Sequence, residues 1–357
     1  MKFRYMVVFA ALAFLASCSN QESTQPAPSG DEEAWVYDES LPVPVMFTTP
    51  QITVQSKAAV NDMVGLEVGV FGLDRTGHWG EATSENVLMY NTQATVSSRQ
   101  DRGLTFSPQV YYPMTNDVNF NFYGYYPYSA DVAYENSRRY EVTYENIGTI
   151  DILWAKEVAN QISDGINTYE GFNARYVRKA IDPINNNPNA LPSLVFEHLL
   201  TGMKFSVRLA EPAVNIRFKG LTLTNIQPNA TLRIADYMEP ETWEGVVVGE
   251  GTPGTIQLKK DSDGSTDFSS VGIGTIAASL GATLMLVPAE SYTAEIYLTV
   301  DGEDIAPVPV TLTREGGFVK GEMYSMTILI QNPEQVVITS SLTPWTEVEG
   351  EEIVIGE

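Results

Sequence analysis

The feature that most constrains the fold is an alternating stretch, LVFEHLLTGMKFSVRL, at Leu194–Leu209. The positions that alternation places on one face are first even-numbered and then odd-numbered: Leu194, Phe196, His198 and Leu200, then Met203, Phe205, Val207 and Leu209. A period of two predicts a β-strand with one buried face. The change of parity at Thr201–Gly202 predicts a β-bulge or a short bend that redirects the strand.

The segment before this strand predicts a boundary between two domains. It reads IDPINNNPNALPS, and its many Asn and Pro residues exclude a continuous helix or strand. A chain of 357 residues is also long enough for two domains that each bury a core. We therefore expect an N-terminal domain at 36–180, a linker at 181–193 and a C-terminal domain at 194–357.

Both domains are predicted to be all-β, because short apolar runs alternate with turn residues and only one short helix is indicated, near Phe172–Lys179. In the first domain the expected strands are Val43–Phe47, Ile52–Val54, Val64–Phe71, Val87–Tyr90, Thr92–Val96, Leu104–Phe106, Val118–Tyr128, Tyr140–Tyr144 and Ile150–Trp154, with a hairpin about Asn91. In the second they include Val214–Leu223 with a parity change at Gly220, Leu284–Val287, Ala294–Val300, Tyr324–Ile330 and Val336–Ile338. The pattern favours β-sandwiches or barrels.

The N-terminus predicts export as a lipoprotein. Residues 1–17 combine a basic start with the apolar run MVVFAALAF, which is too short to span a membrane. Cys18 follows Leu15-Ala16-Ser17 and is the only cysteine, so it cannot form an internal disulfide. The pattern resembles a bacterial lipobox, in which Cys18 carries the lipid, including palmitate; the alternative is an ordinary signal peptide with a chance cysteine. Residues 18–35 are polar and Pro- and Ser-rich, which predicts a disordered tether.

Charge excludes some partners. The chain carries 45 Asp and Glu against 21 Lys and Arg, for a formal net charge of -24. This balance argues against nucleic acid and against an anionic lipid surface bound through basic residues. Solubility outside the cell is the simplest explanation of the acidic excess.

No motif indicates an enzyme, a cofactor or a resident metal. The sequence lacks HExxH, Cys/His metal spacing, a P-loop and a GxSxG elbow, and with so many carboxylates an acidic pair carries no information. We predict His198 to be a core imidazole bonded to backbone. The loop Asp261–Asp267 starts like a calcium loop, but Gly272 stands where the closing glutamate belongs, so a hairpin loop is favoured.

Two stretches could either serve the fold of the chain itself or bind another molecule. Val118–Tyr128 (VNFNFYGYYPY) places large side chains on both faces, which predicts a central strand; a platform for stacking sugars is the alternative. The tail ends in Ile353-Val354-Ile355 after an acidic stretch. It either adds a strand to its own sheet edge or pairs with the edge of another molecule.

Taken together, the chain resembles the fimbrillin-like pilins of Bacteroidota. The matching features are the lipobox Cys18, the strand opened by Phe196-Glu197-His198, the aromatic run ending Tyr125-Tyr126-Pro127-Tyr128, the final strand followed by Trp345, and a basic residue before alanine at Lys57-Ala58. The resemblance implies two tandem transthyretin-like β-sandwich domains and a surface fimbria or pilus held at the outer membrane by a lipid anchor.

The resemblance also implies assembly by strand exchange. A surface protease would cut at Lys57-Ala58 and release Val43–Val54, and a neighbouring subunit would fill the groove with its C-terminal strand, here about Val348–Ile355 and including Val348, Ile353 and Ile355. The partners would be other pilin subunits in a head-to-tail polymer that serves adhesion. The alternative is a monomeric surface lipoprotein that binds a glycan or a host protein, through the tyrosine-rich segment or the His78-Trp79 loop.

Overall fold

The computed structural model describes most of the chain between residues 40 and 343. The gaps in the described residues are 49, 53–61, 77–78, 80–85, 99–102, 115–117, 136–137, 159–160, 164–167, 171, 181–190, 213–214 and 333–334. The lipidation, cleavage and donor-strand predictions at Cys18, Lys57, Ala58, Val348, Ile353 and Ile355 all lie outside them.

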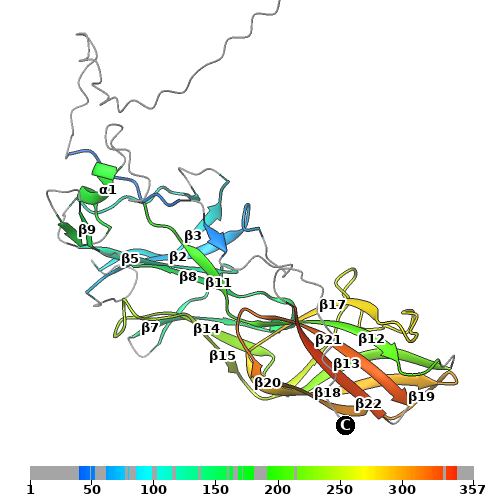
Figure 1. The fold of residues 1–357 in the computed structure, drawn as a ribbon. Coiled ribbons are helices and arrows are strands. Elements are labelled where there is room, and N and C mark those ends of the chain that lie inside the picture. The colour runs from blue at the N-terminus through cyan, green and yellow to red at the C-terminus, as the bar shows by residue number, and fades with distance from the viewer. Residues whose placement is uncertain are drawn as a thin grey trace, which may run out of the picture. The chain divides into compact units, whose positions relative to one another are not determined.

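The chain is all-β, as predicted, and its N-terminal half is built on one large sheet (Figure 1). Seven strands follow one another in the order β1-β11-β8-β5-β2-β3-β4. Their bounds are β1 Gln51–Ile52, β11 Val195–His198, β8 Leu153–Glu157, β5 Phe120–Tyr126, β2 Glu67–Asp74, β3 Val87–Val96 and β4 Leu104–Phe106. The aromatic strand β5 therefore lies in the middle of the sheet, as the large side chains on both of its faces predicted.

A four-stranded sheet covers one face of this large sheet. Its order is β15-β14-β7-β6, with bounds β15 Val246–Glu250, β14 Asn229–Asp236, β7 Arg139–Tyr144 and β6 Ala133–Glu135. Side chains of both sheets form a common core; among them are Phe71, Tyr123, Tyr140, Leu232 and Ile234. Strand pairing thus crosses the linker predicted at 181–193, because β11 pairs with β8 and β14 pairs with β7.

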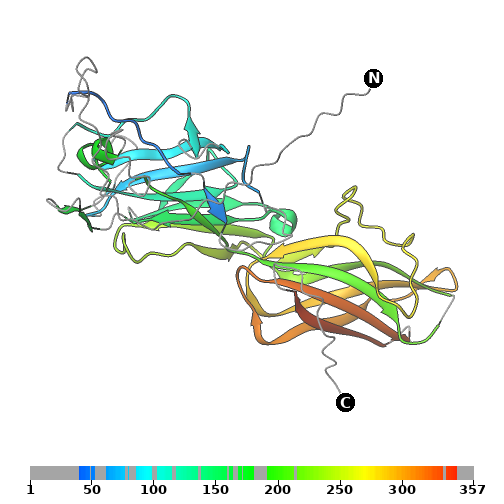
Figure 2. The same cartoon turned by 45° about the horizontal axis from the view of Figure 1, so that its top comes forward.

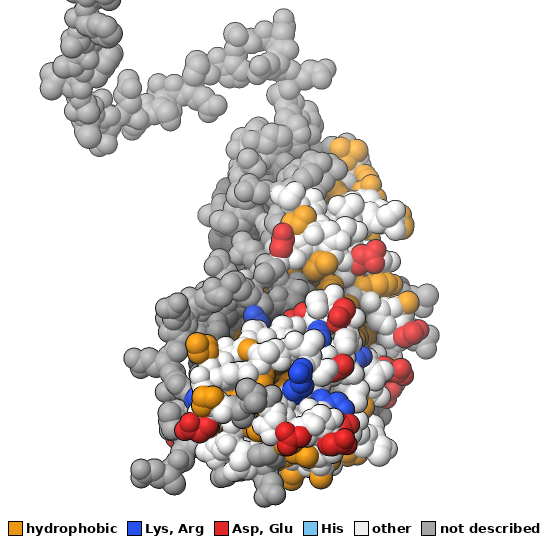
Figure 3. All heavy atoms as spheres, turned by 90° about the vertical axis from the view of Figure 1, so that its right-hand side faces the viewer, with side chains coloured by type: hydrophobic (Ala, Val, Ile, Leu, Met, Phe, Trp, Pro, Cys, Tyr) orange, Lys and Arg blue, Asp and Glu red, His pale blue; other side chains and the backbone are white. Residues whose placement is uncertain are grey.

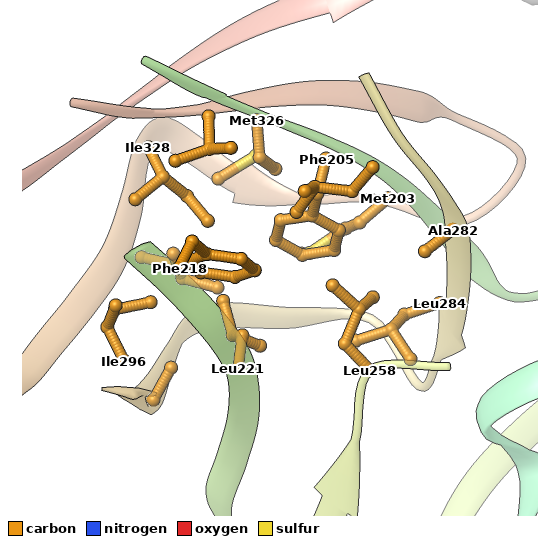
Figure 4. Close-up of a cluster of buried hydrophobic side chains, with 14 of the residues drawn as sticks. Met203, Phe205, Phe218, Leu221, Leu258, Ala282, Leu284, Ile296, Met326 and Ile328 are labelled. Carbon is orange, nitrogen blue, oxygen red and sulfur yellow. The ribbon is translucent and has the colours of Figure 1, made fainter. Parts of the chain in front are cut away.

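Two further sheets form a sandwich in the C-terminal half (Figure 2). One has the order β17-β12-β21-β22, with β17 Ala278–Leu286, β12 Thr201–Leu209, β21 Met323–Asn332 and β22 Gln335–Thr343. The other has the order β16-β13-β18-β19, with β20 also paired to β18; the bounds are β16 Gly254–Gln257, β13 Ile216–Ile226, β18 Ala289–Val300, β19 Glu303–Asp304 and β20 Val308–Phe318. Phe205, Phe218, Leu284, Ile296 and Ile328 meet between them in the hydrophobic core (Figure 4).

The chain changes sheet at Leu199–Leu200, just before the predicted bend at Thr201–Gly202, whose two residues already pair within β12. β11 ends at His198, and β12 begins at Thr201 in the other sandwich. The parity changes there because the side chains before and after the bend enter two different cores. The second parity change, at Gly220, is a register shift within β13 between Phe218 and Gly220, as a bulge requires.

Asn91 does not form the predicted hairpin. β3 runs without interruption from Val87 to Val96, and Asn91 lies within it at a φ of 43°. Asparagine tolerates this left-handed conformation, so the strand accommodates an extra residue opposite Phe71 instead of reversing. The pairing shifts register there, between Val70 and Gly72.

The remaining elements are short. α1, Ala174–Ala180, confirms the helix expected near Phe172–Lys179, and the side chain of Asn173 caps it by accepting the Tyr176 amide at 2.8 Å. The others are the 3-10 helix η1 at Ile147–Thr149 and the hairpin of β9, Gln161–Ser163, with β10, Thr168–Glu170.

Candidate assembly site

The segment that the resemblance marks for release is part of the N-terminal core. Residues 43–48 alternate strictly between buried and half-buried positions. Val43, Val45 and Phe47 point inward and are 1%, 1% and 0% exposed. The predicted strand Val43–Phe47 is therefore extended chain with one apolar face; its one ladder contact is an isolated antiparallel bridge from Pro44 to Tyr111, and regular pairing begins only at β1.

Backbone hydrogen bonds hold this segment along its length. The Val45 amide donates to the Val110 carbonyl and the Tyr112 amide donates to the Val43 carbonyl, both at 2.9 Å. Further along, the Gly103 amide donates to the Phe47 carbonyl at 2.9 Å. The segment then joins the large sheet, because β1 pairs in parallel with β11 through Gln51 to Val195 and Ile52 to Phe196.

Phe47 is the largest side chain that the segment contributes. Its ring meets Phe122 edge to face at 4.9 Å between centroids, and it lies 5.9 Å from Phe106. Phe122 belongs to β5 and Phe106 to β4, so Phe47 closes the face of the large sheet that the four-stranded sheet leaves uncovered. Removing the segment would open an apolar groove along this face.

Tyr112 lines the same core. Its side chain is 2% exposed, and burial raises the pKa of its hydroxyl above the ordinary value because the phenolate would lose its hydration. Sequence reasoning did not identify Tyr112, because it lies outside every predicted strand.

Two tyrosines of the tyrosine-rich strand are buried and cannot stack on a sugar. Tyr123 and Tyr125 are both 0% exposed, and they point into the core shared with the four-stranded sheet. The Tyr125 hydroxyl donates to the Asn91 side chain at 2.6 Å, and burial raises its pKa. No saccharide can stack on rings that the second sheet covers.

Trp79, in the other stretch considered for glycan binding, is also buried. It is 7% exposed, its ring stacks on Tyr140 at 5.9 Å, and its indole N–H donates to the Asp74 carbonyl at 2.8 Å. Its neighbour His78 lies outside the described residues.

His198 is a core imidazole, as predicted, but its partner is a carboxylate instead of backbone. Its Nδ1 lies 3.0 Å from Oδ2 of Asp151, and both side chains are essentially fully buried. Asp151 lies 47 positions earlier in the chain, so only the folded sheet brings the two together.

The acidic loop Asp261–Asp267 folds as a hydrogen-bonded loop. Asp261 accepts the Thr283 amide at 3.0 Å, Asp263 accepts the Ser265 amide at 2.9 Å, and Asp267 accepts the Ser269 amide at 2.8 Å. The contacts of Asp263 and Asp267 span two residues and are Asx turns, whereas that of Asp261 ties the loop to β17. Across the part of the chain that the structure describes, no three His, Cys, Asp or Glu residues are grouped as metal ligands would be.

The surface agrees with the charge count. Acidic, basic and apolar side chains are interspersed on the face that Figure 3 shows, with no continuous basic patch there. In the described residues, no helix has the length and apolar character needed to cross a membrane.

The last described strand is the edge of its sheet. β22 pairs with β21 from Gln335 opposite Asn332 to Thr343 opposite Met323, and among the described residues no second strand pairs with β22. The predicted donor residues begin a few positions after Thr343. β22 ends, at Thr343, on the side of the sheet where β12 and β21 begin.

A comparison with protein-family models identifies the family to which this chain belongs. The model of the fimbrillin-like family matches residues 57–345. This chain belongs to the fimbrillin-like family. The match begins at Lys57, so the segment 43–52 of this fimbrillin-like chain lies before the matched residues. No curated protein sequence matches the chain.

Several solved structures are similar to this fimbrillin-like chain. A candidate cell adhesion protein from Bacteroides uniformis is 18% identical, with a TM-score of 0.49, and the alignment covers 85% of this chain and 98% of that one. One from Parabacteroides distasonis is 11% identical with a TM-score of 0.49, covering 87% and 98%. The fimbrial anchor protein Mfa2 from Porphyromonas gingivalis is 10% identical with a TM-score of 0.35, covering 85% and 97%.

Proposed function

We propose that this chain is a structural subunit of a surface fimbria that serves adhesion, exported as a lipoprotein and assembled by protease-triggered strand exchange. The observation that supports it most is the extended apolar segment 43–48, which is seated in the N-terminal core and is followed by β1. It is held by backbone hydrogen bonds and alternating side chains, which are the contacts that another subunit's strand would reproduce.

The strand is suited to release because one cut would detach it. Val43, Val45 and Phe47 pack in the core, whereas the proposed cleavage point, Lys57-Ala58, follows Phe47 by ten positions. Burying Val43, Val45 and Phe47 contributes about 1.5–3 kcal/mol each. Their loss leaves an apolar groove whose exposure is unfavourable, and this favours capture of an incoming strand.

The donor in this proposal is the C-terminal segment at about 348–355. Val348, Ile353 and Ile355 would supply its apolar side chains. Because donor and groove belong to different ends of one chain, the contact is head-to-tail and does not close on itself, so it builds a filament. Cys18 would carry the lipid that anchors the precursor at the outer membrane before the cut.

Limited trypsin treatment of the mature protein with Cys18→Ser tests the assembly step. We expect cleavage after Lys57, seen by mass spectrometry, followed by ladders on gel filtration. The matched controls are Lys57→Gln, which should remain uncut there and monomeric, and deletion of 346–357, which should be cut without forming ladders. Cleavage of the parent without polymers refutes strand exchange.

Metabolic labelling with a palmitate analogue tests the anchor separately. Label should enter the parent and be absent from Cys18→Ser. Label that persists in Cys18→Ser refutes lipidation at this residue while leaving the assembly proposal intact.

A further inference from the structure

A cavity of about 560 Å³ opens beside the bend between β11 and β12. Besides the bend, its walls come from three segments far apart in the sequence. These are the start of β15, the turn between β17 and β18, and the turn between β20 and β21. The apolar lining includes Leu199, Val246, Val247, Val287, Phe318 and Val319. Its size falls within the range of pockets that enclose an organic group.

The walls of the cavity are fixed by contacts within the fold. The Gly321 amide donates to the Leu200 carbonyl and the Gly202 amide donates to the Glu322 carbonyl, both at 2.9 Å, so the bend and the β20–β21 turn are tied together. Phe318 meets Tyr324 edge to face at 5.0 Å. The cavity is therefore formed before anything enters it.

The mouth of the cavity exposes apolar surface. Val246 is 41% exposed and Val319 is 47% exposed, although both are valines next to an apolar lining. An apolar group that covers this surface would be stabilised by removing it from water.

The last described strand, β22, ends beside the start of β21, which directly follows the β20–β21 turn that lines the cavity. Thr343, the last described residue, pairs with Met323, and Lys320 of the cavity lining precedes Met323 by three positions. Trp345 follows Thr343 by two residues, which span about 7 Å when extended. An indole also matches the lining, because its body is apolar while the carboxylates of Glu244 and Glu290 at the cavity offer acceptors for its N–H.

We propose that Trp345 of the same chain occupies this cavity. The indole anchors the start of the C-terminal segment at the bend, and this fixes the direction in which residues from Val348 onward leave the sandwich. The docking of Trp345 stands independently of strand exchange, because it needs neither cleavage nor a second subunit.

Fluorine NMR tests the occupant. The mature Cys18→Ser protein, labelled with 5-fluorotryptophan, has one signal for each of its five tryptophans, and Trp345→Phe assigns the fifth by its disappearance. We expect the Trp345 signal to resist broadening by a soluble gadolinium chelate several-fold better than free fluorotryptophan. A signal broadened like the free amino acid overturns the proposal.

Surface variants at the mouth provide the matched comparison. Val319→Glu, and separately Val246→Glu, place a charge at the rim and should expose the Trp345 signal. Ile276→Glu changes a side chain that is 85% exposed and is absent from the cavity lining, and it should leave the signal protected. Far-UV circular dichroism establishes that each variant is folded. Protection that is lost on dilution assigns the cavity to a second copy's tail and also overturns the proposal.

Discussion

Phe47→Ala should loosen the N-terminal strand more than any other single truncation within it. The ring is fully buried and meets Phe122 edge to face at 4.9 Å. Removing a buried Phe typically costs about 3–5 kcal/mol, a value that includes the lost aromatic contact and the cavity left behind. We expect the free energy of unfolding in urea to fall by roughly this amount if the strand unfolds together with the rest of the domain.

Hydrogen exchange distinguishes this outcome from local release. The amides of Val45 and Tyr112 donate to carbonyls across the contact between the strand and its groove. If Phe47→Ala frees the strand alone, these two amides lose protection while amides of β5 keep theirs. Either result lowers the work needed to open the groove, so trypsin should cut at Lys57 faster than in the parent.

The matched control is Met46→Ala, on the half-buried side of the same strand. It should cost less than about 1 kcal/mol, because the side chain does not enter the core. The reasoning is refuted if Phe47→Ala and Met46→Ala have equal effects on unfolding and on exchange, since the inward face of the strand would then contribute nothing specific.

Three further outcomes follow from buried polar groups. Burial raises the pKa of the Glu157 carboxyl to about 7, so its ionisation disfavours the folded state. The stabilisation from the neutral form is complete below about pH 4.5 and is lost as the pH rises through 7. Glu157→Gln should flatten this pH dependence in denaturation measured across that range. Asp151→Ala removes one partner of a buried pair and should cost about 3–5 kcal/mol in urea unfolding, whereas Glu197→Gln, in a half-exposed pair with Lys320, should cost less than about 1 kcal/mol. Tyr125→Phe leaves the Asn91 side chain without the buried hydroxyl that donates to it and should lower the melting temperature, a loss corresponding to about 1–3 kcal/mol.

The amino-acid sequence determined the fold class and the burial of individual strands. Alternation is a local property, since successive side chains of a strand point to opposite faces whatever its neighbours are. The central place of β5 followed from large side chains at both Phe122 and Tyr123. The redirected strand at Gly202 followed from the change of parity, and the helix near Phe172–Lys179 followed from its short amphipathic run.

Only the tertiary structure decided which strands pair and which side chains meet. The sequence placed a linker at 181–193, but β14 returns to pair with β7, because the tyrosine-rich face of the large sheet requires an apolar cover that lies later in the chain. The same holds for His198 and Asp151, and for Phe47 and Phe122. Pairing at long range depends on which complementary surfaces remain uncovered once the local strands form, and alternation within one strand carries no record of its partner.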